Sequence, residues 1–495
     1  MSPQRMVGRL MLVCGLAAPA GAWAQASSAQ WHADAAGRID ALRKASLSIT
    51  VTRPDGTVVP GAQMELKMRR HAFGFGTAVS DIYLIRDPAT NANVGRYRDA
   101  LEKGWYDPQA GRYKPLFNRA TIESGMKWSK WEDPARQAAA IEAVDWLLSK
   151  GHDIRGHAMI WQHSTRDFGL PDRIYNELFN ASGAFSPRYA NTDNSPAAQA
   201  WRADLREQSL SHIRAIGDHA FAGGVKPVEW DVLNEHRAHN RLAEAINPGV
   251  PAMQRPVMKE WFDAAHQATP QARLFVNDYD IVNNGPNNTT VRSTYLQQIQ
   301  WLQAQGAPIH GIGFQSHFFS GGQRRTGEQI FTVLDQFAAT GLRLAITEFD
   351  MIGTGWGSNA EQTKATLTRE ILIAAFSHPS VDSFTMWGFW DGRHWEGSAP
   401  LFDDQWNLKP SGQAYVDLVL KEWWTDLDGT TNAQGVFSGR AMKGDYELMV
   451  TVDGVVHTFP ISLREDGATQ VVVPEPAATG ALMGAGLLLR RRRSS

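Results

Sequence analysis

Two glutamates in this sequence each follow directly on a short apolar run. Glu235 comes after residues 230–234, and Glu348 comes after residues 345–347. A charged side chain beside a buried strand is costly unless it is paired or used, and a lone strand-end glutamate is more often an ion-pair partner. Glycoside hydrolysis requires two carboxyl groups, one to protonate the leaving oxygen and one to attack the anomeric carbon. We therefore take Glu235 and Glu348 as a candidate catalytic pair.

The elements that must position this pair alternate between short apolar runs and amphipathic helical stretches. The apolar runs cover residues 73–79, 117–122, 154–161, 227–233, 273–277, 309–315, 342–347 and 383–387. Eight such repeats predict an α/β fold, a (β/α)8 TIM barrel over residues 71–425, with its chemistry at the C-terminal ends of the strands. Alternation alone also fits a doubly wound sheet, but no G-x-G-x-x-G motif follows any of these runs.

Small β elements are expected on both flanks of the barrel. Residues 47–70 alternate apolar and polar side chains around Pro-Gly and Asp-Gly turns, and residues 433–472 alternate around Asp453-Gly454, a good hairpin signal. We expect the second element to pack with, or beside, the first. Residues 25–46 are predicted to be a flexible N-terminal segment.

Composition narrows the class of function. The chain has 495 residues, which suffices for a large barrel plus a smaller module. Its net charge of −2 gives no electrostatic footprint for nucleic acid, so we expect no nucleic-acid partner. The 18 tryptophans suit stacking on sugar rings, although many of them could equally belong to the core.

Both ends of the chain carry targeting patterns. Residues 1–24 have a basic start, an apolar run and an Ala-x-Ala site, which predict a signal peptide that also contains the one cysteine, Cys14. Residues 473–495 contain Pro-Glu-Pro, an apolar stretch and four arginines, and resemble a PEP-CTERM sorting signal; a simple membrane anchor is the alternative. We expect recognition by export and sorting machinery in a Gram-negative bacterium, with a final location at the cell surface or outside the cell.

Eight stretches, in barrel order, resemble glycoside hydrolase family 10, the xylanases. The resemblance extends over about residues 47–472. The matching stretches are residues 75–79, 123–128, 155–161, 230–235, 277–279, 311–317, 346–350 and 386–391. The resemblance implies an endo-β-1,4-xylanase that acts on xylan or a related β-1,4-polysaccharide, as a monomer and without a metal or organic cofactor.

The resemblance also assigns roles to the catalytic pair. Glu235 would be the acid/base and Glu348 the nucleophile of a retaining reaction, with carboxyl groups roughly 5–5.5 Å apart. We expect the Glu348 carboxylate to raise the pKa of Glu235 by like-charge repulsion. Asn234 would contact the sugar 2-hydroxyl. His317, fixed by Asp350, would keep Glu348 ionised, and Gln315 would join the same network.

Substrate-binding roles follow in the same way. The residues implied to contact the non-reducing-end sugars are Glu123, Lys127 and His157. The aromatic residues implied to stack on sugars are Trp161, Trp387 and Trp395. Tyr279 is a candidate on the leaving-group side, where core packing is an equal alternative. Departures from the family pattern occur at Ser124, where Asn is usual, and at Gln162-His163-Ser164, where His-Ser-Gln is common; they leave the subsite preference open.

Two alternatives remain open from the sequence. The chain could be another β-1,4-glycanase of the same clan that acts on glucan or cellulose. It could instead be a surface polysaccharide-binding protein without turnover. His236 and His239 have a His-x-x-His spacing, but they lack a convincing third ligand, so no zinc site is predicted.

Overall fold

The computed structural model describes residues 20–283, 289–322 and 325–475. Within these residues, eight parallel strands form a closed ring, because the last of them, β14, pairs with the first, β3. The strands of the ring are β3 (Gly74–Val79), β6 (Arg119–Ile122), β7 (Asp153–Gly156), β9 (Glu229–Asn234), β10 (Arg273–Asp278), β11 (Gly311–Phe314), β13 (Arg343–Ile352) and β14 (Val381–Met386). Each overlaps one of the eight predicted apolar runs, and the predicted TIM barrel is confirmed.

Two short strands extend the ring at its C-terminal end. β8 (Ile160–Trp161) pairs with the end of β9, and β12 (His317–Phe319) pairs with the end of β13. Both carry side chains of the predicted site, so these extensions hold the residues of the barrel mouth on regular backbone.

Helices surround the ring. The longer ones are α3 (Ala92–Glu102), α5 (Pro134–Ser149), α7 (Pro196–Asp218), α9 (Val257–Ala268), α10 (Thr289–Ala304), α11 (Gly327–Ala338) and α12 (Ala360–Ser377). Shorter turns of helix are α2 (Asp81–Leu84), α4 (Trp128–Trp131), α6 (Asp172–Leu178), α8 (Arg241–Ile246), α13 (Pro410–Tyr415), η1 (Ala222–Gly224), η2 (Ala252–Gln254), η3 (Asp391–Arg393) and η4 (Val416–Glu422). Their starts follow local sequence signals: Asp133 caps α5 ahead of Pro134, and Thr326 forms a capping box with Gln329 at α11.

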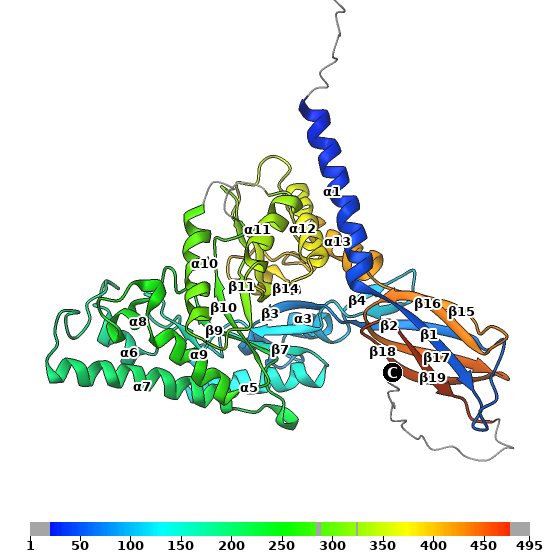
Figure 1. Cartoon of the computed structure of the whole chain (residues 1–495), viewed down its shortest axis with the longest axis horizontal. Helices are drawn as coiled ribbons and strands as arrows, with labels where there is room; N and C mark the ends of the chain where they lie inside the picture. The colour runs from blue at the N-terminus through cyan, green and yellow to red at the C-terminus, as the bar shows by residue number, and fades with distance from the viewer. Residues whose placement is uncertain (1–19, 284–288, 323–324, 476–495) are drawn as a thin grey trace, which may run out of the picture.

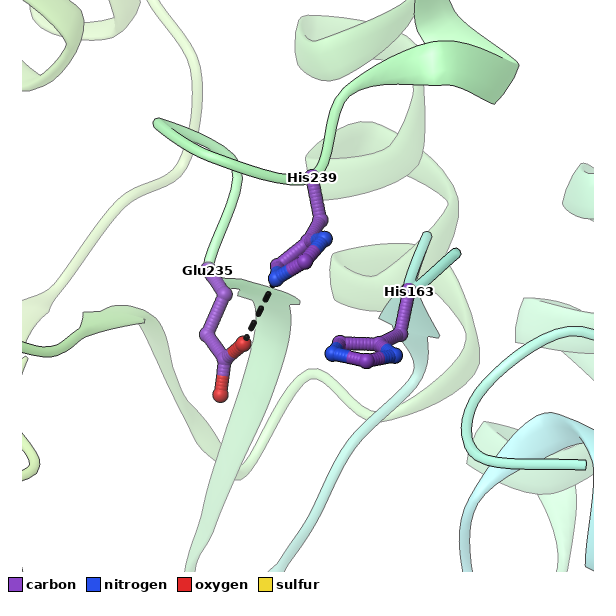
Figure 2. Close-up of side chains that lie close together, drawn as sticks. All are labelled: His163, Glu235 and His239. Carbon is purple, nitrogen blue, oxygen red and sulfur yellow. Dashed lines mark ion pairs between the residues drawn. The ribbon is translucent and has the colours of Figure 1, made fainter. Parts of the chain in front are cut away.

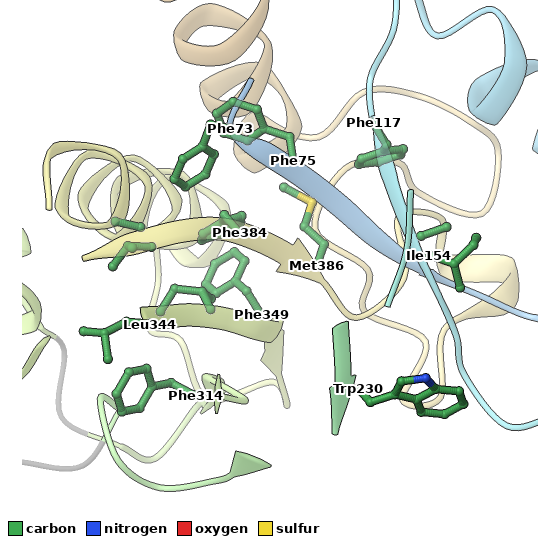
Figure 3. Packing of buried hydrophobic residues seen from close by; sticks show 14 of the residues in the cluster. Phe73, Phe75, Phe117, Ile154, Trp230, Phe314, Leu344, Phe349, Phe384 and Met386 are labelled. Atoms are coloured by element: carbon green, nitrogen blue, oxygen red, sulfur yellow. The ribbon is translucent and has the colours of Figure 1, made fainter. Parts of the chain in front are cut away.

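Large apolar side chains fill the space around the strands. Figure 3 shows Phe349 and Phe384 on neighbouring strands, and their ring centroids lie 5.2 Å apart. Phe75 packs against Phe73 in the same cluster, 4.9 Å from centroid to centroid. Close packing of this kind resists displacement, so the strand ends that carry the site are held in fixed positions.

The N-terminal end of the barrel carries a buried charge network. Glu229, at the start of β9, is fully buried and pairs with Arg119, Arg155 and Arg273. Burial acts to raise the pKa of Glu229, but the three guanidinium groups outweigh it and hold the pKa at about 2. This end of the barrel is therefore built on fixed charge pairs.

The two flanking β elements form one module beside the barrel, where Figure 1 shows the blue strands β1 and β2 among orange and red ones. In one sheet, β1 (Lys44–Thr52) lies between antiparallel β16 (Val436–Met442) and parallel β19 (Gly467–Val472). In the other, β2 (Gln63–His71) lies between β15 (Asp426–Thr430) and β17 (Gly444–Val452), which pairs with β18 (Val455–Leu463). A separate hairpin joins β4 (Trp105–Asp107) and β5 (Arg112–Lys114).

The expectation of a flexible segment at residues 25–46 is wrong. Residues Ala20–Arg43 form helix α1, and β1 begins directly after it. Trp31, Ala35 and Ile39 recur every fourth residue and are buried, which gives the helix one apolar stripe. His32 bonds Glu370 on α12 over 2.8 Å, and the polar composition of the segment concealed this docking.

The predicted targeting segments lie mostly outside the described residues. Of the predicted signal peptide, residues 1–19 fall outside, and of the predicted sorting signal, residues 476–495 fall outside. Among the helices of the described ranges, none has the length and apolar character needed to cross a bilayer.

Candidate active site

Glu235 and Glu348 lie at the same end of the ring. Glu235 follows β9 with a positive φ of 54°, and its backbone N–H donates to the Asn277 carbonyl over 2.8 Å. Glu348 lies in β13 at an irregularity in the pairing with β14, between Ile346 and Phe349. A positive φ and a β-bulge both redirect a side chain relative to regular strand geometry. Local backbone departures therefore aim the two carboxyl groups.

The Glu235 carboxyl accepts hydrogen bonds from uncharged donors. Gln315 Nε2 donates to Oε1 over 2.9 Å, and Trp161 Nε1 donates to Oε2 over 2.9 Å. Burial raises the pKa of Glu235 above its ordinary value, and the charge of Glu348 adds to the rise. The sequence argument named only the repulsion from Glu348, whereas burial is the larger cause. The result is a carboxyl group that keeps its proton to a higher pH than an ordinary glutamate does.

Glu348 has the opposite character. Burial alone would raise its pKa, but the nearby His157 ring and hydrogen bonds from His317 and Asn277 hold the pKa below the ordinary value. His317 Nε2 lies 3.3 Å from Glu348 Oε2, and Asn277 Nδ2 donates to Oε1 over 2.6 Å. This carboxyl group favours its ionised form, as a nucleophile must.

Asn277 links the two glutamates, a role that the sequence analysis missed. Its Nδ2 donates both to Glu348 Oε1 and to Asn234 Oδ1, the latter over 3.0 Å. Asn234 Nδ2 in turn lies 3.4 Å from Glu235 Oε1, and Thr347 donates to Asn277 Oδ1 over 2.7 Å. Asn277 and Asn234 are direct partners in the pairing of β10 with β9. The sequence signal that could have revealed this role is that both asparagines occupy the same position at the ends of two consecutive strands.

His317 lies between Glu348 and Asp350, as the resemblance implies. Its Nδ1 is 2.7 Å from Asp350 Oδ1. Burial acts to lower the pKa of His317, but the two carboxylates outweigh it and raise the pKa to about 10, so the ring is cationic and donates from both nitrogens. Asp350 Oδ2 also accepts a hydrogen bond from Trp395 Nε1 over 2.8 Å and bonds the His394 ring. The sequence analysis did not identify His394 as part of the site.

The polar residues implied for sugar binding line the same mouth. His157 Nδ1 bonds Asp231 over 3.0 Å and lies 3.9 Å from Glu348 Oε1. Lys127 Nζ lies 4.6 Å from the centre of the Trp161 ring. Burial lowers the pKa of Lys127, while Glu123, Glu348 and Glu235 act to raise it. Burial likewise raises the pKa of Glu123, against the charge of Lys127.

The aromatic residues divide by exposure. Trp387 is buried and packs edge-on against His157, at 5.1 Å between centroids. Trp395 is 48% exposed although its indole N–H is anchored on Asp350, so about half of its surface can contact a ligand. Trp161 also donates a hydrogen bond to Glu235, so it contacts the candidate catalytic pair directly. Tyr279 is half-buried beneath the guanidinium of Arg237, 4.8 Å from its ring.

The fold and the site together define a class of protein, the (β/α)8 barrels with a linked pair of carboxyl groups at the C-terminal ends of the strands. The particular family follows from sequence. The model of glycosyl hydrolase family 10 matches residues 106–418, and the chain belongs to that family.

The chain is also similar to curated relatives and to solved structures. The anti-sigma-I factor RsgI6 of Acetivibrio thermocellus is 27% identical over 89% of this chain and 49% of its own length. Endo-1,4-beta-xylanase 1 of Arabidopsis thaliana is 24% identical over 88% of this chain and 39% of its own length. The chain thus spans half or less of these two relatives. Xylanase 10B of Thermotoga petrophila shares the fold, with a TM-score of 0.53 and 22% identity over 71% of this chain and 95% of that structure.

Proposed function

We propose that this chain is a retaining endo-β-1,4-xylanase with Glu235 as acid/base and Glu348 as nucleophile. The observation that carries the proposal is the split in proton affinity between two linked carboxyl groups, with the pKa of Glu235 raised and that of Glu348 lowered. Two carboxyl groups whose environments separate their pKa values are the pattern of an acid and a nucleophile at one glycosidic bond.

In the first step, the Glu348 carboxylate attacks the anomeric carbon while Glu235 gives its proton to the leaving oxygen. The glycosidic bond breaks, and the sugar becomes an ester of Glu348. As the ester forms, Glu348 loses its negative charge, so the hydrogen bonds from Asn277 and His317 to this carboxyl group become weaker. Asn234, held by Asn277, is oriented to contact the sugar 2-hydroxyl.

In the second step, Glu235 acts as a base. It has lost its proton, and the ester at Glu348 no longer repels its negative charge. Glu235 takes a proton from water, the water oxygen attacks the anomeric carbon, and the ester bond breaks to restore the Glu348 carboxylate. Two inversions at one carbon give net retention.

Xylan is the proposed substrate because several relatives carry that activity in their names. They include Endo-1,4-beta-xylanase 1 of Arabidopsis thaliana and Endo-1,4-beta-xylanase 3 of Hypocrea jecorina, the latter 29% identical over 61% of this chain and 75% of its own length. Xylose lacks the hydroxymethyl group of glucose, and a wall that includes Trp395 would favour the smaller sugar. A relative named Exoglucanase XynX, 24% identical, makes glucan the second candidate substrate.

Export remains part of the proposal. Its support is the sequence of residues 1–24 and 473–495, whose patterns match a signal peptide and a sorting signal. The mass of the protein recovered from the cell surface or medium tests it, because processing at both ends would remove these segments.

The decisive experiment compares Glu235→Ala and Glu348→Ala on xylan and on an aryl xyloside with a good leaving group. Glu235→Ala should lose about 10²- to 10⁴-fold in rate on xylan but keep partial glycosylation of the aryl xyloside, which needs no acid. Glu348→Ala should lose both activities. Glu142→Ala, at an exposed glutamate of α5, is the matched control and should behave as wild type.

Three outcomes contradict the proposal. Inverted product configuration would remove the nucleophile role of Glu348. A wild-type rate for Glu235→Ala on xylan would remove the acid. Xylan binding without release of reducing ends would favour a binding protein without turnover.

A further inference from the structure

Two histidines lie beside the proposed acid/base and have no part in the mechanism above. Figure 2 shows His163 and His239 next to the side chain of Glu235. His239 Nε2 is 3.5 Å from Glu235 Oε2, and the two imidazole rings are 4.1 Å apart between centroids. One nitrogen or oxygen atom from each of the three residues lies within 4.8 Å of the other two. Two imidazoles and a carboxylate are ligands that zinc accepts.

This trio differs from the His-x-x-His pair in the sequence. His236 is fully engaged, because Gln162 Nε2 donates to its Nδ1 over 3.0 Å and its Nε2 donates to the Ala252 carbonyl over 2.9 Å. His163 takes its place from a different part of the chain, just after β8. The Gln162-His163 order buries the glutamine and leaves the histidine at the barrel mouth.

The spacing of His239 and Glu235 suits a shared metal ion. Bonds of about 2.0–2.1 Å in a tetrahedral zinc site put neighbouring ligand atoms roughly 3.4 Å apart. The observed 3.5 Å between His239 Nε2 and Glu235 Oε2 is already close to that value. His163 lies in a partly exposed segment, where its ring stacks on Phe168 and is tilted against His239.

The charges around the trio act in both directions. Burial lowers the pKa of His163 and of His239 to about 4; His239 and Lys127 lower that of His163 further, and Arg237 lowers that of His239. Both rings are therefore neutral near pH 7, and each has a lone pair on one nitrogen. Lys127 and Arg237 also oppose a bound cation. The Glu235 carboxylate supplies the negative charge that offsets them once its proton has left.

We propose that His163, His239 and Glu235 form a reversible binding site for a borderline divalent cation such as Zn²⁺, and that the bound ion inhibits hydrolysis. An ion on Glu235 occupies the carboxyl group that must protonate the leaving oxygen. The inhibitory effect rests on the proposed function, whereas metal binding by the trio does not. The fourth coordination position would remain for water.

His163 is the ligand that must change most. The Thr165 N–H donates to its Nδ1 over 3.0 Å, which places the ring proton on Nε2. Coordination through Nε2 requires the other tautomer and loss of this exposed hydrogen bond. We therefore expect weaker binding than in a closed site with four protein ligands.

The test is calorimetric titration of Zn²⁺ into the full chain after treatment with EDTA. Wild type should bind one Zn²⁺ ion per chain. His163→Gln and His239→Gln should each weaken that affinity at least tenfold. His457→Gln, on β18 in the β module, should not change it. Mg²⁺ should not compete, because it prefers oxygen ligands.

Rates on xylan, whose leaving oxygen needs the proton of Glu235, complete the test. Inhibition of the wild type should follow the calorimetric binding curve and be reversed by EDTA, and the two histidine variants should need at least tenfold more Zn²⁺. Absence of binding, or binding unaffected by both variants, overturns the site. A chain that binds Zn²⁺ through these histidines but shows no metal-free hydrolysis overturns the proposed function alone.

Discussion

Glu229 and Glu235 lie at opposite ends of strand β9 and have opposite electrostatic surroundings. Burial acts to raise the pKa of each. Glu229 is ringed by three arginines that hold its pKa at about 2, whereas Glu235 accepts hydrogen bonds from Gln315 and Trp161, which carry no charge, and its pKa is raised. The same residue type is therefore a fixed ion-pair partner at one end of the strand and, in the proposed mechanism, a proton donor at the other. What differs is the charge of the neighbours.

Stability gives the largest test of this contrast. Glu229→Gln leaves three buried or partly buried arginines without their shared anion, and removing one partner of a buried pair costs about 3–5 kcal/mol. Glu235→Gln removes a carboxyl group that is costly to ionise, so the free energy of unfolding should change by less than about 1 kcal/mol or rise. Chemical denaturation of both variants measures the difference. A larger loss for Glu235→Gln than for Glu229→Gln would reverse the assignment.

Acid sensitivity sharpens the contrast. The folded pKa of Glu229 lies at about 2 against an ordinary 4.5, so its contribution is fully present above pH 4.5 and is lost as the pH falls through 2. This shift corresponds to on the order of 3 kcal/mol. Glu235 has a raised pKa, so its contribution is present below pH 4.5 and is lost as the pH rises through its folded pKa.

The measurement is the free energy of unfolding between pH 2 and 6. Wild type should lose more stability toward pH 2 than Glu229→Gln, because the variant has already lost the titrating group. Parallel curves for the two proteins would show that Glu229 carries no acid-sensitive stability.

Glu348 provides an intermediate case, a buried carboxylate kept ionised by a histidine that itself depends on Asp350. Asp350→Asn should remove the charge that keeps His317 cationic and raise the pKa of Glu348. Hydrogen bonds to charged groups contribute about 1.5–3 kcal/mol, so kcat/KM should fall roughly 10- to 100-fold.

The pH profile separates this role from a general packing defect. The acidic limb of kcat/KM should move to higher pH in Asp350→Asn. Asp382→Asn, at the start of β14 and paired with Arg273 and Arg343, is the matched control and should leave the limb in place. If the acidic limb does not move in Asp350→Asn, Asp350 does not control the pKa of Glu348 through His317.

The sequence predicted the barrel because each strand is a compact apolar run, and it predicted the glutamate pair because each glutamate directly follows such a run. The role of Asn277 was missed because its partners are brought together only by strand register. Helix α1 was missed because its apolar stripe is meaningful only against α12, far along the chain. The dominant effect of burial on Glu235 likewise depends on tertiary packing.

The β module has a consequence for how the molecule assembles. Strand β1 is synthesised early, yet both of its neighbours, β16 and β19, emerge only after the entire barrel has been made. During synthesis, both edges of β1 are therefore unpaired, and unpaired strand edges can form hydrogen bonds with strands of other chains. In a nascent chain stalled before residue 436, we expect β1 to be prone to aggregation and sensitive to proteases, even if the barrel has already closed.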